Sequence, residues 1–115
     1  MIDSEPKFIQ GVFGFTGAGY DNPVPLPGAT YTVAADKRAQ PLYFRGGNST
    51  AEMVTVVLLR DGKVMRYFPV GAKASVHVQL AVVEDLEPET SLALMVLAPE
   101  GLSGTLIVDL GVVEI

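Results

Sequence analysis

Few side chains in this sequence are suited to catalysis. His77 is the only histidine and there is no cysteine, so a thiol nucleophile and a thiolate-bound metal are excluded, and a Ser-His-acid triad would have to use His77. His77 lies between Val76 and Val78 in an alternating stretch, on the same side as Ser75 and Gln79, which is typical of a histidine exposed to water. We therefore predict no catalytic residue and a protein that is not an enzyme.

One serine stands in a glycine-containing motif. Gly101-Leu102-Ser103-Gly104 matches the first part of the G-x-S-x-G nucleophile elbow, but Thr105 occupies the position of the second glycine. The elbow also requires a strand-to-helix turn, and the residues around Ser103 do not predict one. Ser103 is therefore not predicted to be a nucleophile.

A cluster of carboxylates comprises Glu84, Asp85, Glu87 and Glu89. Calcium prefers oxygen ligands of this kind, but the spacing fits no calcium-binding loop, and Pro88 restricts how the backbone could surround an ion. The glycines of residues 14–19 fit neither the dinucleotide nor the phosphate-binding fingerprint. The sequence therefore predicts a solvated acidic turn, with no metal and no cofactor.

Two further groups of residues could contact ligands or carry a modification. The aromatic residues in question are Tyr20, Tyr31, Tyr43 and Phe44. They would form a stacking surface for a sugar or another ligand if they were exposed, whereas aromatic residues of a small domain are more often in the core. Asn48-Ser49-Thr50 has the form of a glycosylation acceptor, but it ends the turn-forming cluster 45–50, which predicts a turn.

The strongest structural signal is a β-hairpin. Residues 53–60 and 63–68 are rich in β-branched and aromatic residues, and Asp61-Gly62 between them favours a two-residue turn. An uninterrupted ladder from this turn pairs Arg60 with Lys63, Leu58 with Met65 and Val56 with Tyr67.

Both faces of this predicted hairpin are apolar. One carries Val54, Val56, Leu58, Met65 and Tyr67. The other is the candidate interface and carries Met53, Thr55, Val57, Leu59, Val64, Arg66 and Phe68. Because an antiparallel sheet with one solvated face should alternate polar and apolar residues, the second face needs a cover. That cover is the proline-rich segment, the N-terminal residues or another chain.

The remaining sequence predicts short strands separated by turns. We expect an N-terminal arm over residues 1–8 and a Gly/Pro-rich loop over residues 16–28. Strands are expected over residues 8–15, 30–34, 41–45, 74–83, 91–97 and 104–110. Leu, Ala and Met in residues 91–97 also favour a helix, but the length and surroundings of the segment favour a strand. The prediction is all-β: a single antiparallel β-sandwich domain spanning residues 1–115, with eight or nine short strands and either an immunoglobulin-like or a jelly-roll topology.

Charge is distributed unevenly along the 115 residues, whose net charge is −5. Residues 37–73 hold seven of the eight cations, and residues 74–115 hold seven carboxylates and no cation, an asymmetry that could steer head-to-tail association. The acidity argues against a nucleic-acid partner, and no apolar run is long enough to span a bilayer. Residues 1–5 lack the basic and apolar regions of a signal peptide, which predicts a cytoplasmic or virion protein.

These features predict a non-catalytic structural protein that binds copies of itself or a larger assembly. In its length, lack of cysteine, β-rich composition and expected arm, the chain resembles small capsid-decorating proteins of virions. The alternative is a module that binds a ligand, a glycan or a signalling partner. Residues 67–78 are similar to the sensory rhodopsin transducer family, whose members are also small β-sandwich proteins.

Overall fold

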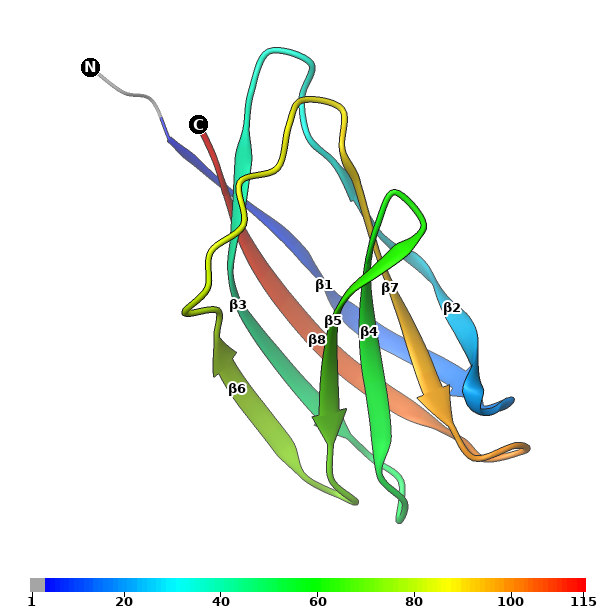
Figure 1. Cartoon of the computed structure of the whole chain (residues 1–115). Coiled ribbons are helices and arrows are strands. Elements are labelled where there is room, and N and C mark those ends of the chain that lie inside the picture. The colour runs from blue at the N-terminus through cyan, green and yellow to red at the C-terminus, as the bar shows by residue number, and fades with distance from the viewer. Residues whose placement is uncertain (1–3) are drawn as a thin grey trace.

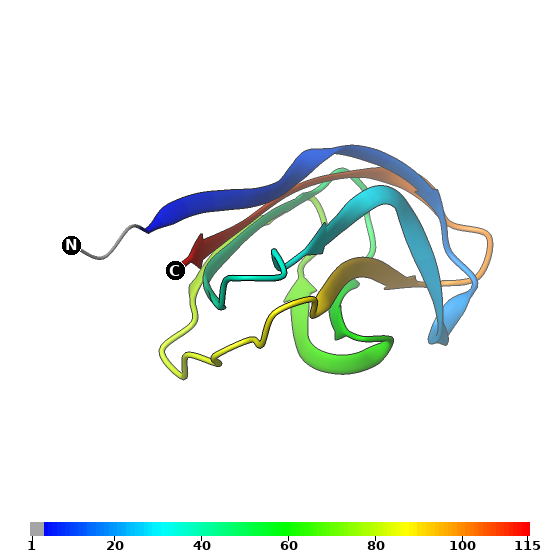
Figure 2. The same ribbon diagram turned by 90° about the horizontal axis from the view of Figure 1, so that it is seen from above.

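The computed structural model describes residues 4–115 and forms two four-stranded antiparallel sheets that pack face to face (Figures 1 and 2). The strands are β1 (Glu5–Thr16), β2 (Gly19–Thr32), β3 (Ala39–Asn48), β4 (Val54–Arg60), β5 (Lys63–Val70), β6 (Ser75–Gln79), β7 (Ser91–Ala98) and β8 (Ser103–Glu114). The described residues include no helix, and hence no helix that could cross a membrane. The predicted all-β sandwich is confirmed.

The topology is that of a jelly roll. One sheet has the order β1-β8-β3-β6 and the other β2-β7-β4-β5. Strand β1 pairs with β8, β2 with β7, β3 with β6 and β4 with β5, so the chain is a single antiparallel ribbon wrapped around the core. An immunoglobulin domain would instead place its first two strands next to each other in one sheet. The structure therefore selects the jelly roll from the two predicted topologies.

The core lies between the inward faces of the two sheets. Strand β8 contributes Leu106, Val108, Leu110 and Val112, and β7 contributes Leu92, Leu94, Val96 and Ala98. The alternation in β7 explains why residues 91–97 form the predicted strand: every second side chain is buried, and this period of two does not suit a helix. Phe44 and Phe68 stack across the sheets with ring centroids 4.2 Å apart.

The predicted N-terminal arm is wrong over its described part. Strand β1 begins at Glu5, which pairs with Glu114, and Phe8 pairs with Gly111. Residues 1–3 lie outside the described part of the chain. The β8 strand offers a full ladder of backbone partners along its length, and these hydrogen bonds hold residues 5–8 in the sheet.

The predicted loop over residues 16–28 is wrong as well, because most of it belongs to β2. This edge strand pairs with β7 irregularly, with register shifts between Gly19 and Val24 and between Pro25 and Thr30. Proline has no N–H to donate to a ladder, and it is tolerated on an edge strand. The prolines therefore interrupt the pairing of β2 without excluding it from the sheet.

The turn cluster predicted over residues 45–50 lies largely within β3. Gly46 and Gly47 pair with both β6 and β8, and the corner begins only after Asn48. The Asn48 side chain is 5% exposed. Its Nδ2 donates to the carbonyl oxygens of Glu52 and Gly71 at 2.8 and 3.1 Å. Asn48 is thus a structural residue of the β3–β4 corner.

The central hairpin has the predicted turn but a different register. Asp61 and Gly62 have φ values of 49° and 81°, and Arg60 pairs with Lys63. A bulge then shifts the ladder, so that Leu58 pairs with Arg66 rather than with Met65. Downstream of the bulge the two faces of β5 exchange: Phe68 is buried in the core and Tyr67 is 60% exposed.

A tyrosine and a glutamate join the two sheets at one end of the sandwich. The Tyr31 hydroxyl of β2 donates to the Glu114 carboxylate of β8, which also accepts from the Ala34 N–H at 3.4 Å. Glu114 is 5% exposed. Burial and the hydrogen bond to Glu114 raise the pKa of Tyr31 above its ordinary value, so the phenol remains a proton donor at neutral pH.

Replacing Tyr31 with phenylalanine should therefore destabilise the protein by about 2 kcal/mol, because a buried carboxylate loses a charge-assisted hydrogen bond. The measurement is the free energy of unfolding from urea titration at neutral pH. Tyr67→Phe is the matched control, since no hydrogen bond of its hydroxyl is recorded among residues 4–115, and its effect should stay within about 0.5 kcal/mol. Equal effects of the two variants would contradict a role for the Tyr31–Glu114 bond.

Candidate functional site

The outer face of sheet β2-β7-β4-β5 is apolar. We call it the apolar face and define it by Tyr20, Val57, Val64, Tyr67 and Leu97. Together with Asp21 and Pro23 these residues surround a small hollow of about 170 Å³. Val57 points away from the core and is nevertheless only 1% exposed, whereas Tyr20 and Tyr67 are 47% and 60% exposed. Outward positions of a solvated sandwich are normally polar, so this face is unusual for a chain that works alone.

Part of the expected cover comes from the proline-rich strand. The Tyr20 hydroxyl donates to the backbone carbonyl of Met53 at 2.6 Å, which ties β2 to the start of β4. Tyr67 and Val64 stay about half exposed at the β5 side of the hollow. The chain therefore covers Val57 with its own tyrosines but leaves the tyrosines themselves in contact with water.

The residues of the predicted interface fall in different places. Thr55, Val57 and Leu59 alternate with the core-facing residues of β4 and point outward, Val64 lies beside them, and Met53 is 45% exposed just before the strand. The assignment is wrong for Phe68, which is 3% exposed in the core. Arg66 pairs with the core-facing residue Leu58 and is held by Glu84.

Three residues of the apolar face, Tyr20, Tyr67 and Leu97, were not among the predicted interface residues. Leu97 lies in the expected strand over residues 91–97, for which no outward face was predicted. Tyr67 was assigned to the opposite face because an unbulged ladder pairs it with Val56, and the bulge reverses that assignment. Tyr20 lies in a segment whose prolines suggested a loop. The only sequence signal for its position is its aromatic type at the start of that segment, which does not define a strand.

Two of the four carboxylates in the acidic cluster form ion pairs within the chain. Glu84 accepts from Arg66 at 2.5 Å and lies 3.6 Å from Arg60, and Asp85 pairs with Arg38 at 2.8 Å. No group of three or more His, Asp or Glu side chains within residues 4–115 is arranged to hold a metal ion. Part of the charge of the middle and the end of the sequence is thus paired within one molecule.

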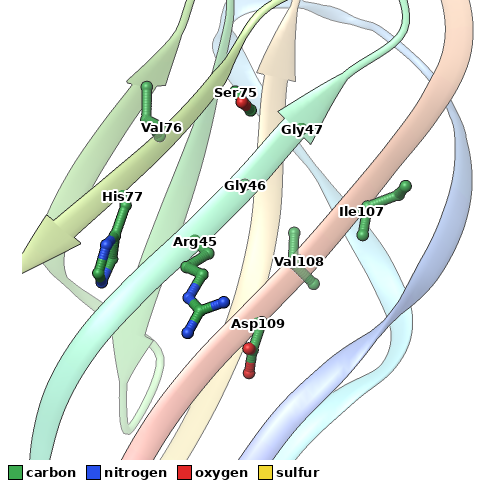
Figure 3. A pocket seen from close by; sticks show the side chains of 9 residues that line it. All are labelled: Arg45, Gly46, Gly47, Ser75, Val76, His77, Ile107, Val108 and Asp109. Carbon is green, nitrogen blue, oxygen red and sulfur yellow. The ribbon is translucent and has the colours of Figure 1, made fainter.

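The outer face of the other sheet carries a polar row across all four strands. Gln10 of β1 pairs with Asp109 of β8, Asp109 with Arg45 of β3, and Arg45 with His77 of β6. Neighbouring strands are about 4.8 Å apart, so paired residues on one face are adjacent. Figure 3 shows Arg45 between His77 and Asp109 on this face.

Tyr43 organises one side of this polar row. Its hydroxyl donates to the Asp109 carboxylate at 3.1 Å, its ring lies 5.4 Å from the Arg45 guanidinium carbon, and it meets the His77 ring edge-on at 6.0 Å. Burial, followed by the hydrogen bond to Asp109, raises the pKa of Tyr43. Gly111 makes room for the ring, since a Cβ there would lie 2.0 Å from it.

A shallow hollow of about 590 Å³ adjoins the other side of the polar row. Its floor is Gly47, which has no side chain, and it is bordered by Ser75 and His77 on β6 and by Ile107 and Asp109 on β8 (Figure 3). Sequence reasoning missed this site, because its residues come from three strands that are far apart in the chain.

The remaining sequence candidates are dispersed. Ser103 shares a hydrogen bond of 2.9 Å with Thr16, and His77 lies beside Tyr43, so the described residues record no pairing of this serine with this histidine. Of the aromatic residues, Phe44 is buried in the core and Tyr31 bonds Glu114, whereas Tyr20 and Tyr43 lie on the outer faces of opposite sheets.

The fold is similar to two kinds of solved structure. The CBM36-1 domain of a multidomain xylanase from the hindgut metagenome of Trinervitermes trinervoides matches over 95% of this chain and 96% of its own, with a TM-score of 0.62 and 17% identity. The VP2 subviral particle of infectious bursal disease virus matches over 96% of this chain and 32% of its own, with a TM-score of 0.54 and 13% identity.

A structure of the Gt strain of the same virus matches over 97% of this chain and 33% of its own, with a TM-score of 0.52 and 12% identity. This chain thus corresponds to about a third of the viral chains. At these identities the likeness shows the β-sandwich fold alone. No protein-family model and no curated protein matches the sequence.

Proposed function

We propose that this chain is a non-catalytic structural protein that assembles with further copies of itself through the apolar face. The observation that carries the proposal is the outward-pointing cluster around Val57, in which Tyr20 and Tyr67 are half exposed over an otherwise apolar sheet surface. Burying such a surface against a second copy removes apolar area from water. Tyrosine is also among the residue types enriched at the centres of protein interfaces.

Strand β2, one of the two edge strands of the same sheet, favours association through faces rather than through edge pairing. Exposed edge strands invite pairing with another chain, and prolines on an edge suppress that pairing. The β2 edge carries Pro23, Pro25 and Pro27, and its ladder with β7 is already irregular. The β2 edge therefore offers few backbone donors to a second copy, whereas the apolar face beside it offers an apolar contact surface.

The similarity to the structures from infectious bursal disease virus is compatible with this proposal, because two of those structures are of particles. The similarity contributes only the precedent of a fold, since the identity is 12–13%. Membership of a virion is a further step of the proposal, which detection of the chain in purified particles would test.

Replacing Tyr67 with lysine should weaken self-association by at least about tenfold, because a charge then enters the centre of the contact and, in a two-fold symmetric pair, enters it twice. The measurement is the solution mass by light scattering coupled to size exclusion, at two protein concentrations roughly a hundredfold apart. The unaltered chain should form a defined oligomer, and the variant should shift toward monomer.

Val12→Lys provides the matched control. Val12 is 69% exposed on the outer face of the opposite sheet, so the same charge is introduced with similar exposure and away from the apolar face. Its mass should equal that of the unaltered chain. A chain that is monomeric at both concentrations, or an oligomer that Val12→Lys disrupts and Tyr67→Lys does not, would contradict the proposal.

A second candidate function is carbohydrate binding. It is supported by the polar row on the opposite sheet, and the CBM36-1 neighbour is a carbohydrate-binding module with the same fold. Which carbohydrate such a site could bind depends on the side chains of this chain that line it.

A further inference from the structure

The hollow over Gly47 continues as a groove along β3. A second hollow of about 300 Å³ shares Gly47, Ser75 and Ile107 with the first and extends toward Ser49 and Thr105. The groove therefore runs between β6 and β8, with the polar row at one end and Lys73 and hydroxyl-bearing residues at the other. Its size falls within the range of small-molecule sites, and its length suits an extended ligand.

Unlike charges lie side by side at the polar end. Arg45 is exposed and Asp109 is its cross-strand neighbour, and no ion pair between them is recorded among the described residues, where Arg45 instead faces the Tyr43 ring. The guanidinium offers donors and the carboxylate offers acceptors. Two adjacent hydroxyl groups, each of which can donate and accept, match this combination.

The charged residues that line the groove limit the kinds of ligand that it can bind. At the polar end Arg45 and Asp109 cancel, so neither a strongly anionic nor a strongly cationic ligand gains from both. Lys73 lines the other end of the groove, and the anionic probe in the experiment below tests its influence. Ile107 is 59% exposed and forms an apolar wall beside the glycine floor. A sugar ring has an apolar face of C–H groups and a rim of hydroxyls, so it can lie against Ile107 while its hydroxyls reach the polar row.

The polar groups are held in place before any ligand arrives. The Tyr43 hydroxyl fixes the Asp109 carboxylate, and the Tyr43 ring supports the Arg45 guanidinium. Fixing side chains in advance reduces the entropy lost on binding.

We propose that the groove over Gly47 binds a short neutral oligosaccharide, with vicinal hydroxyls of one sugar held between Asp109 and Arg45. This site lies on the sheet opposite the apolar face and does not depend on self-assembly. A chain that fails to assemble can therefore still bind sugar, and a chain that binds no sugar can still assemble.

Gly47→Val is the decisive variant. A Cβ at Gly47 would lie 3.9 Å from the Ile107 Cβ, which is ordinary van der Waals contact, and a β-branched residue suits a strand. The variant should thus fold at least as stably as the unaltered chain, while its side chain fills the floor of the groove. We expect it to lower sugar affinity by at least about tenfold.

The experiment titrates ¹⁵N-labelled protein with xylohexaose, cellohexaose and mannohexaose, and with a polygalacturonate fragment as the anionic comparison. At least one neutral probe should shift the amide signals of Gly46 and Gly47 at concentrations up to about 10 mM. Arg45→Gln, which replaces the exposed guanidinium with a shorter, uncharged amide that has fewer donors, should weaken the binding of the same probe by about tenfold.

Gly14→Val is the matched control, because Gly14 is an exposed glycine on the same sheet face, across β8 from the groove, and a Cβ there meets nothing within 4 Å. It should bind the sugar as the unaltered chain does. The proposal is overturned if no neutral probe binds, if only the anionic probe binds, or if Gly47→Val binds unchanged while its melting temperature shows that it is folded.

Discussion

Replacing Phe68 with alanine is expected to lower the free energy of unfolding by about 3–5 kcal/mol. Phe68 is 3% exposed and stacks on Phe44 at an interplanar angle of 4°. The stack joins β5 of one sheet to β3 of the other, so alanine leaves a cavity between the two sheets. Because a domain of this size is stable by only about 5–15 kcal/mol, chemical denaturation should show a large fall in the midpoint.

Tyr67→Ala is the informative comparison, because the two residues are neighbours on β5 and point to opposite faces. Tyr67 is 60% exposed, so its truncation should cost less than about 1 kcal/mol. Both variants are measured at low protein concentration, where self-association contributes least. The reverse ranking would show that β5 pairs without its bulge and that Tyr67 occupies the core.

The turn of this hairpin is predictable from the sequence, but the bulge that follows it is not. The Asp61-Gly62 turn follows from local backbone preference, since both residues adopt positive φ. The position of the bulge does not follow from the sequence in this way. Val64 and Phe68 are both apolar, so either register places apolar residues on each face. With no polar alternation, the period of two that normally reveals register carries no information.

The jelly-roll topology could not be predicted from local sequence patterns either. The ribbon pairs Glu5 with Glu114, and no turn or spacing in the sequence specifies a ladder between the two ends of the chain. The alternation in β7 and β8 predicts strands and their buried faces, but it does not say which strands are neighbours. Strand content was therefore predictable, whereas strand order was not.

The candidate sugar site could not be predicted from the sequence for the same reason. Gln10, Asp109, Arg45 and His77 form one row only because four strands align in a particular register. Gly46 and Gly47 suggested a turn, since glycine is common in turns and weakens a strand. In the structure Gly46 has a steric reason, since a Cβ there would lie 2.7 Å from the Phe44 ring, whereas Gly47 has room for a Cβ and forms the open floor of the groove.

Asn48→Asp should destabilise the protein by about 3–5 kcal/mol at neutral pH, because it places a negative charge in a buried corner where the side chain faces backbone carbonyl oxygens. The Asn48 amide donates to the carbonyls of Glu52 and Gly71 and accepts from the Thr50 N–H at 2.9 Å and the Thr50 hydroxyl at 2.8 Å. An aspartate at this position keeps the acceptor but directs a second oxygen at carbonyl oxygens, so both donated bonds are lost.

The pH dependence of this loss separates the missing donor from a packing defect. Carbonyl oxygens and burial favour the protonated acid, so the pKa of the new carboxyl should rise in the folded state above its unfolded value near about 3.9. The unfolded chain then releases its proton first, and stability falls as the pH rises through this interval. We expect the deficit of Asn48→Asp to be smaller at pH near 4 than at pH near 7.

Asn22→Asp is the matched control, since Asn22 is exposed on β2 and the same substitution there should cost less than about 0.5 kcal/mol at either pH. A deficit at Asn48 that is small, or the same at both pH values, would contradict the hydrogen-bond assignment. The same bonds bear on the sequence Asn48-Ser49-Thr50: a glycan on Nδ2 would remove one of the two N–H donors that close the corner and would have to emerge from a side chain that is 5% exposed. In the folded chain the side chain of Asn48 therefore holds β3 against the start of β4 and the end of β5.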